Sequence, residues 1–484
     1  MVIMERKSYN RALEEYVRRT ECERVNKSIV TSVDRRVKKL ERAPLSSALT
    51  FLKRSHNPNP AIPRIFAFAK IHKEGKEVRP VVEKCRGPTY ILEKRLHRFI
   101  SDQLLNSDLV ANNPTIVVKE LQELSLMDEE VGSVMDFESL YPSIRIESCY
   151  EALIEFMLRI KPEIGAFEND LKELANLICY ESFFSYDKQV YRQKKGVPIG
   201  SPMSGLLCEL VLRNLEKQVV NSFKKDIVFY KRYVDDVCII WRNGERVHEF
   251  IQVINNTNKD GLKLKLEQKS HERIHFLDID IQLKGDGITT SIYIKPTHNP
   301  LYIPANSNDP HEYKMSAFRA LIRRAFTHCS NRLDRNKEID RIKEVATNLG
   351  FCRSTIEGLV KSYERGKKRR TGTDQFKITK FTYNKNIKDI MKQISDKKRS
   401  KIVYKRGPNL YSILRNDKDR LKKEETAGVY KIPFENQQLG IMKDYIGVTR
   451  RNLAIRLKEH RYDISKGHCT TILSNMAQAE ASGC

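Results

Sequence analysis

Two adjacent aspartates, Asp235 and Asp236, lie between two apolar runs and are the first residues of the chain that could perform chemistry. The runs span residues 227–230 before them and 238–241 after them. Aspartate is depleted in strands, and a buried carboxylate is costly unless it is paired or bound to a metal. The pattern therefore predicts a hairpin whose tip carries carboxylates into a metal site. A simple polar turn is the alternative.

A third carboxylate, Asp136, lies in the mainly apolar segment 133–137. Two Mg²⁺ ions about 3.5–4 Å apart can clamp the attacking and leaving oxygens of a phosphoryl transfer. Such a pair of ions needs carboxylates that neighbouring strands bring together. Asp136, Asp235 and Asp236 are therefore the candidate ligands of two Mg²⁺ ions.

Two other segments carry residues suited to phosphate binding. Residues 65–73 and 78–82 predict a hairpin, in which Arg79 precedes a proline and could contact a triphosphate with both arms of its guanidinium. A solvated surface charge is the alternative for Arg79. Residues 193–202 predict a glycine–proline turn that opens a helix, where close backbone approach and the helix N-terminus favour anions. An ordinary helix start is the alternative there.

The charge and cysteine content of the chain indicate which kinds of partner and compartment to expect. The 484 residues contain 88 Lys and Arg against 62 Asp and Glu, a formal net charge of +26, which predicts a polyanionic partner. The ten cysteines include no Cys-x-x-Cys pair, so we expect reduced thiols and no zinc knuckle. No apolar run approaches the roughly 20 residues of a membrane span, and the N-terminus lacks a signal-peptide core. We therefore expect no membrane partner and no secretion.

The order and spacing of these motifs resemble a known family. Asp136-Phe-Glu-Ser-Leu-Tyr141, residues 193–204 and Tyr233-Val-Asp-Asp-Val237 resemble the palm motifs of reverse transcriptases. The further segments that resemble Penelope-like retroelements are 69–73 and 79–82 in the fingers, 276–278 beside the primer end, and 292–298, 307–310 and 323–325 in the thumb. The resemblance extends over residues 60–365.

The resemblance implies an RNA-directed DNA polymerase that copies an RNA template from a DNA primer with dNTPs. It implies that Asp136 and Asp235 bind both metal ions and that Asp236 supports them. It also implies that Tyr141 is the aromatic gate whose ring excludes a 2′-hydroxyl group. This tyrosine disfavours an RNA polymerase that copies RNA, where a small residue is expected.

The same resemblance assigns four residues to the nucleotide site. Gln193 and Gly196 would line the nucleotide and template site, Arg79 would contact the incoming triphosphate, and Lys70 would assist it. Leu277 and Asp278 are expected to shape the structure and not to perform chemistry.

The last segment carries a second set of motifs. Residues 428–432 and 444–448 predict two strands bearing tyrosines, and a helix follows. Core strands of a small domain are the alternative. After a Penelope-like polymerase this order resembles a GIY-YIG endonuclease domain that nicks target DNA. The resemblance implies that Tyr430 and Tyr445 position or deprotonate water, that Arg456 holds the scissile phosphate, and that Glu480 binds a divalent metal. The Cys-x-x-Cys often found between the motifs is Phe434-Glu-Asn-Gln437 here.

We therefore expect an α/β (α+β) right-hand polymerase followed by a small α/β domain, with incomplete sequence at both ends. Apolar spacing predicts charged helices over residues 8–55 and a core helix over 146–160. The expected domains are fingers at 1–130, palm at 131–290, thumb at 291–365, a basic linker at 366–425 and the GIY-YIG domain at 426–484.

The basic runs of the linker leave nuclear targeting, phosphate contact and a solvated face open. We expect a nuclear protein, with the cytoplasm as a second compartment. A non-catalytic, nucleic-acid-binding relic of a retroelement is the alternative to an enzyme.

Overall fold

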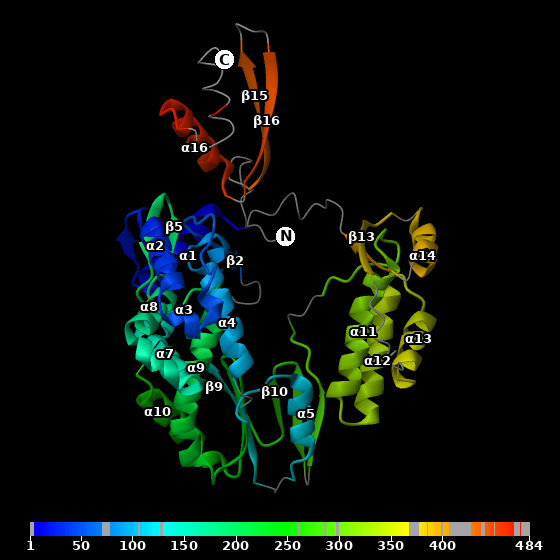
Figure 1. Ribbon diagram of the computed structural model, residues 1–484. Helices are drawn as coiled ribbons and strands as arrows, with labels where there is room; N and C mark the ends of the chain where they lie inside the picture. The colour runs from blue at the N-terminus through cyan, green and yellow to red at the C-terminus, as the bar shows by residue number, and fades with distance from the viewer. Residues whose placement is uncertain are drawn as a thin grey trace. The chain divides into compact units, whose positions relative to one another are not determined.

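The computed structural model describes most of the chain, and Figure 1 labels its elements. The described residues are 4–69, 78–104, 107–125, 129–259, 261–284, 287–296, 300–366, 377–384, 386–397, 400–405, 427–436, 441–449, 451–468 and 475. The chain forms two compact units, each assembled from separate stretches. The first comprises Met1–Gln103, Cys149–Leu207 and Asn416–Cys484, and the second comprises Leu104–Ser148 and Cys208–Arg415.

Amphipathic helices open the first unit, as the spacing of apolar residues predicts. They are α1 (Arg6–Arg19), α2 (Ile29–Arg42) and the short α3 (Leu45–Ala48). Leu13 and Tyr16 are buried on one face of α1, where they pack with Ile65, Val82 and Phe184 of the adjoining sheet. This packing explains why a strongly charged helix forms here, since its stability comes from one buried face.

The sheet of the first unit has five strands in the order β1-β6-β5-β2-β3. The strands are β1 (Glu23–Val25), β2 (Arg64–Ala69), β3 (Val78–Glu83), β5 (Phe183–Tyr186) and β6 (Gln189–Arg192). β2 and β3 pair in antiparallel register, as the sequence predicts for this hairpin. The further helices are α4 (Tyr90–Gln103), α7 (Ile146–Ile160) and α8 (Glu168–Cys179); α7 is the expected core helix and begins in the second unit.

The second unit is built on an antiparallel sheet in the order β7-β8-β4-β9. Its strands are β4 (Val131–Phe137), β7 (Ile227–Tyr233), β8 (Asp236–Trp241) and β9 (Leu264–Ser270). The neighbouring helices in sequence are α5 (Pro114–Gln122), α6 (Leu140–Ser143), α9 (Ser204–Val219) and α10 (Val247–Thr257). β4 and β8 are buried along almost their whole length, because both are central strands of this sheet.

A second sheet shares the core of this unit. It contains β10 (Arg273–Phe276), β11 (Ile279–Lys284) and β12 (Gly287–Ile292) in antiparallel order. Ile274, Ile279 and Ile281 of this sheet belong to one buried apolar cluster with Val134 of β4 and Ile240 of β8. The strands that carry the candidate carboxylates therefore rest on a continuous core.

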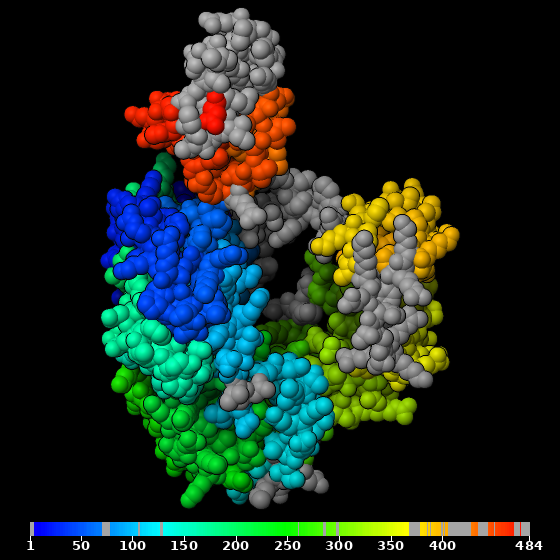
Figure 2. Space-filling model, viewed as in Figure 1, coloured from blue at the N-terminus to red at the C-terminus, as the bar shows by residue number. Residues whose placement is uncertain are grey.

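Three longer helices follow in the same unit: α11 (His311–His328), α12 (Arg332–Asn348) and α13 (Arg353–Glu364). They enclose their own core around Met315, Phe318, Ile322, Ile342 and Ile356. A small parallel pair comes next, with β13 (Lys377–Thr382), α14 (Lys388–Lys397) and β14 (Ser400–Lys405). Its yellow and orange residues lie at the surface in Figure 2, and Ile390 of α14 is exposed.

The C-terminal segment forms the expected hairpin and helix. β15 (Gly428–Asn436) and β16 (Ile441–Thr449) pair in antiparallel register, and α16 (Leu453–Ser465) follows. Together the elements confirm a mixed helix and sheet fold. Within the described part of the chain, no helix has the length and apolar character that a bilayer span requires. The expected domain boundaries stay predictions.

Candidate active site

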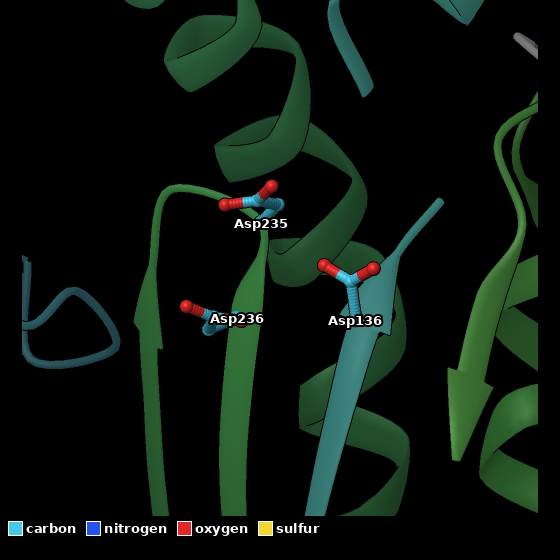
Figure 3. Close-up of side chains that lie close together, drawn as sticks. All are labelled: Asp136, Asp235 and Asp236. Carbon is cyan, nitrogen blue, oxygen red and sulfur yellow. The ribbon is translucent and has the colours of Figure 1, made fainter. Parts of the chain in front are cut away.

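The structure places Asp235 and Asp236 at the tip of the hairpin that the sequence predicts. β7 and β8 pair with Tyr233 opposite Asp236, so Val234 and Asp235 form a two-residue turn. On the other side of β8, Asp136 of β4 pairs directly with Asp236. The three carboxylates, on segments far apart in the sequence, thus meet at the same end of two neighbouring strands (Figure 3).

The three aspartates form a compact and half-buried acidic group. Each offers one carboxylate oxygen, and these oxygens all lie within 4.8 Å of one another. Burial, followed by the negative charges of Asp235 and Asp136, raises the pKa of Asp236 to about 6. A divalent cation would remove this mutual repulsion, and carboxylate oxygens are the ligands that Mg²⁺ prefers. Among the described residues, Asp136, Asp235 and Asp236 are the acids, histidines or cysteines that lie close enough together to hold a metal ion as a group of three.

Tyr141 lies close enough to the three aspartates for the charge of Asp235 to raise the pKa of its phenol. It belongs to the short helix α6, which Ser139 precedes in a left-handed backbone conformation with φ of 52°. Burial, then Cys208 and Asp235, raise the pKa of Tyr141 to about 12. The phenol is therefore neutral at physiological pH, and its ring offers bulk without charge beside the carboxylates.

Two of the expected nucleotide contacts, Arg79 and Gln193, lie in the first unit. Arg79 is on β3, and Gln193 directly follows β6. Arg79 is an exposed residue of β3 that pairs with Phe68 of β2. Gln193 is buried, where it accepts a hydrogen bond of 3.2 Å from the Tyr16 hydroxyl and donates one of 2.8 Å to the Lys195 carbonyl. These side-chain contacts are internal to the protein, and the role of Gln193 toward a nucleotide stays a prediction.

Of the other two expected nucleotide contacts, Gly196 and Lys70, only Gly196 belongs to the described residues. Gly196 has a φ of 73°, a left-handed conformation that glycine adopts without strain. Lys70 lies outside the described residues. The nucleotide-binding roles of Arg79, Gly196 and Lys70 stay predictions.

A buried ion pair that sequence reasoning missed supports the glycine–proline turn. Lys84 donates a hydrogen bond of 2.6 Å to Glu93, and the hydroxyl of Ser201 donates one of 2.5 Å to the same carboxylate. Gly200 beside it has a φ of 117°, and a Cβ there would lie 2.2 Å from the Val82 carbonyl oxygen. The turn needs glycine for this close approach. No sequence pattern marks the Lys84–Glu93 pair, because its two ends lie in different elements.

The C-terminal motif residues also come together. Tyr430 is buried, and its hydroxyl lies 2.7 Å from Nε2 of His460. The rings of Tyr430 and Tyr445 have centroids 6.1 Å apart. A hydrogen bond to Tyr430 is the main cause that raises the pKa of Arg456, so the guanidinium joins the same cluster.

The cluster contains one residue that the sequence assigned only to a helix face. His460 lies one helical turn after Arg456, and burial, followed by Arg456, lowers its pKa. Its spacing from Arg456 was the available signal. Glu480 lies outside the described residues. The catalytic roles of Tyr430, Tyr445 and Arg456 stay predictions.

Two family models match the chain. Residues 71–281 match "Reverse transcriptase (RNA-dependent DNA polymerase)", and residues 301–359 match "Animal helix-turn-helix domain". The second match spans α11 and α12 and ends within α13, inside the region expected to be the thumb. No curated protein matches the chain.

Solved structures show similarity at low identity. Telomerase from Candida albicans in complex with a TWJ fragment of telomeric RNA is 10% identical with a TM-score of 0.46, over 73% of this chain and 59% of that one. Truncated apo telomerase from Candida tropicalis is 13% identical with a TM-score of 0.40, over 58% and 60% of the two chains. The BmCPV RNA-dependent RNA polymerase at its elongation state is 14% identical with a TM-score of 0.38, over 72% and 31%.

This chain thus spans about 60% of the length of the telomerase structures that it matches. The family match at residues 71–281 includes the strands and turn that bring the three aspartates together. The chain therefore contains a reverse transcriptase domain, and Asp136, Asp235 and Asp236 form its candidate active site.

Proposed function

We propose that this protein is an RNA-directed DNA polymerase that uses two Mg²⁺ ions held by Asp136, Asp235 and Asp236. The observation that carries the proposal is the meeting of these carboxylates within 4.8 Å inside the reverse transcriptase domain. Bound Mg²⁺ would supply charge stabilisation for both the attacking 3′-hydroxyl and the leaving pyrophosphate. The substrates are an RNA template, a DNA primer and dNTPs.

Each of the candidate site residues has a separate role in the proposed reaction. Asp136 and Asp235 would supply oxygens from two different segments, which the Phe137 amide joins through its bond to the Asp235 carbonyl. The pKa of Asp236 is raised to about 6, and a bound cation would favour its ionised form. Tyr141 contributes ring bulk that excludes the 2′-hydroxyl of a ribonucleotide. Arg79, assisted by Lys70, is the proposed contact for the incoming triphosphate, and Gln193 and Gly196 would line the nucleotide and template site.

We further propose that the polymerase belongs to a Penelope-like retroelement, with a palm, fingers and thumb, and acts in the nucleus. Residues 426–484 would be a GIY-YIG endonuclease domain that nicks target DNA to supply a primer. The cluster of Tyr430, Tyr445, Arg456 and His460 supports this proposal. Because Nε2 of His460 lies 2.7 Å from the Tyr430 hydroxyl, it can accept that proton when the tyrosine activates water.

One experiment separates this function from its alternatives. The full chain is given a DNA primer annealed to an RNA template, with dNTPs or with rNTPs and Mg²⁺. Extension with dNTPs that disappears in Asp235→Asn supports the proposal. Extension only with rNTPs would indicate an RNA polymerase, and tight binding without extension would indicate a non-catalytic relic. Asp102→Asn, at an exposed position on α4, is the matched control.

A further inference from the structure

Arg232 lies at the end of β7, and its side chain is completely buried. A buried guanidinium is stable only when its charge and its donors are all matched. Glu216 of α9 accepts hydrogen bonds of 2.6 Å from Nε and 3.0 Å from Nη2, and Glu209 of the same helix accepts one of 2.9 Å from Nη1. Glu209 and Glu216 are two helical turns apart, so both face the sheet.

The network fixes the guanidinium firmly. The Tyr230 hydroxyl donates a hydrogen bond of 2.9 Å to the Glu216 oxygen that also receives Nε of Arg232. Burial opposes the ionisation of Glu209, but Arg232 and Arg213 together hold its pKa below the usual range. The backbone of Arg232 is also held, since its amide bonds to the Leu109 carbonyl at 2.8 Å.

Arg232 makes one further hydrogen bond, to the turn formed by Val234 and Asp235. Nη1 donates a hydrogen bond of 3.1 Å to the carbonyl oxygen of Val234. Val234 has a φ of 56°, a left-handed conformation that a β-branched residue rarely adopts. Such strain persists only where the surroundings hold it, and it clusters at functional sites.

The turn is therefore held on both of its carbonyl groups. Arg232 bonds the carbonyl of Val234, and the Phe137 amide of β4 bonds the carbonyl of Asp235 at 3.0 Å. The second bond comes from the residue that follows Asp136. These two bonds therefore hold the strained residue Val234 and the metal-ligand candidate Asp235 from both sides of the turn.

We propose that Arg232 is a positioning residue that keeps Val234 in its strained conformation and thereby holds Asp235 and Asp236 in position to bind metal. This role rests on the proposed function, because it assigns Arg232 to the metal site of the polymerase. A purely structural ion pair would anchor α9 to the sheet without any effect on metal affinity. The two roles therefore predict different results for metal binding.

The test measures Mn²⁺ affinity of the full chain by electron paramagnetic resonance, and the Mg²⁺ dependence of primer extension. Arg232→Lys keeps the charge, but the three donors of an ammonium cannot reproduce the four hydrogen bonds that the planar guanidinium makes to Glu209, Glu216 and the Val234 carbonyl. Residues that orient metal ligands typically change metal affinity or activity about 10- to 100-fold when altered. We expect Arg232→Lys to weaken Mn²⁺ binding and to raise the Mg²⁺ requirement by a factor in this range.

A second substitution tests the cause. Glycine adopts a φ of 56° without strain, so Val234→Gly removes the need for the clamp. We expect Arg232→Lys combined with Val234→Gly to recover most of the lost Mn²⁺ affinity. Arg341→Lys is the matched control, because it disrupts another two-bond pair, with Glu338 on α12, and should leave Mn²⁺ affinity unchanged.

Two outcomes overturn the role of Arg232. They are an unchanged Mn²⁺ affinity in Arg232→Lys, and a double variant that binds Mn²⁺ as weakly as Arg232→Lys alone. If Arg232→Lys does not fold, Arg232→Lys combined with Glu209→Gln is compared with Glu209→Gln alone, because the neutral glutamine leaves the ammonium one fewer buried charge to match while the bond to the Val234 carbonyl is still lost. Unchanged affinity there also overturns the role. Wild-type protein that binds no Mn²⁺ would instead overturn the proposed function.

Discussion

The amide of Phe137 donates a hydrogen bond of 3.0 Å to the carbonyl oxygen of Asp235. This bond continues the pairing of Asp136 with Asp236 by one step, into the turn itself. Both partners of this bond are backbone groups, so strand pairing holds one carbonyl of the turn, and the Arg232 side chain bonds the other, at Val234. A metal site built in this way is already organised before any ion binds.

Asp235→Asn is expected to abolish primer extension while primer–template binding is retained. The substitution removes a charged metal ligand and keeps the volume of the side chain. Loss of several kcal/mol of metal stabilisation corresponds to a rate decrease on the order of a thousandfold or more. Single-turnover extension and fluorescence anisotropy measure the two quantities. A variant that extends primers at the wild-type rate would contradict the assignment of Asp235.

Metal binding should strengthen as the pH rises through about 6, where Asp236 loses its proton. The raised pKa of Asp236 means that the metal-free protein gains stability from this group at low pH and loses it as the pH rises through about 6. Added Mg²⁺ should therefore raise the melting temperature more above about pH 6 than below it. Thermal melts with Mg²⁺ and with EDTA test this. Asp236→Asn should remove the pH dependence, and its persistence there would show that another group titrates.

Tyr141→Ala is expected to let the enzyme incorporate ribonucleotides. The neutral ring of Tyr141 lies beside Asp235, and only its bulk would exclude the 2′-hydroxyl group. The measurement is the ratio of kcat/KM for a dNTP to that for the matching rNTP. Tyr141→Phe keeps the ring and should keep the ratio. If the ratio does not fall in Tyr141→Ala, the gate lies elsewhere.

Binding to primer–template should depend steeply on salt, since the net charge of +26 indicates many phosphate contacts. With about six to ten such contacts, affinity should fall roughly 10³- to 10⁵-fold between about 50 and 200 mM salt. Titrations at several salt concentrations give the slope. A flat profile would mean that the positive charge serves some partner other than nucleic acid.

Gly447→Ala should displace Tyr430 from His460. A Cβ at Gly447 would lie 2.4 Å from Cζ of Tyr430, so the ring must move. Overpacking of this kind typically costs about 1–3 kcal/mol. If this hairpin belongs to a nuclease, Gly447→Ala should also lose nicking of supercoiled plasmid DNA. Gly428→Ala is the control on the same hairpin, because nothing lies within 4 Å of its added Cβ. Equal nicking by both variants would separate Tyr430 from the chemistry.

The local elements and the hairpin that carries Asp235 and Asp236 were predictable from the amino-acid sequence. Apolar runs on both sides of Asp235 and Asp236 predict a hairpin with those residues at its tip, and β7 and β8 confirm it. The signal is local, because strand pairing across a two-residue turn depends on neighbours in sequence. The helices α1, α2, α7 and α16 were predictable for the same reason, since periodic apolar residues mark a buried face.

Which charged and polar side chains are buried, and which partners they bond, was not predictable without the fold. Arg232 follows the apolar run of residues 227–230, and the sequence gives no sign that Glu209 and Glu216 neutralise it. Gln193 was assigned to the nucleotide site, yet its side chain bonds to Tyr16, which is 177 residues away. Hydrophobic periodicity records only which faces are apolar. The free energy of a buried charge depends on partners that the fold brings from distant segments, so those partners appear only when the fold is known.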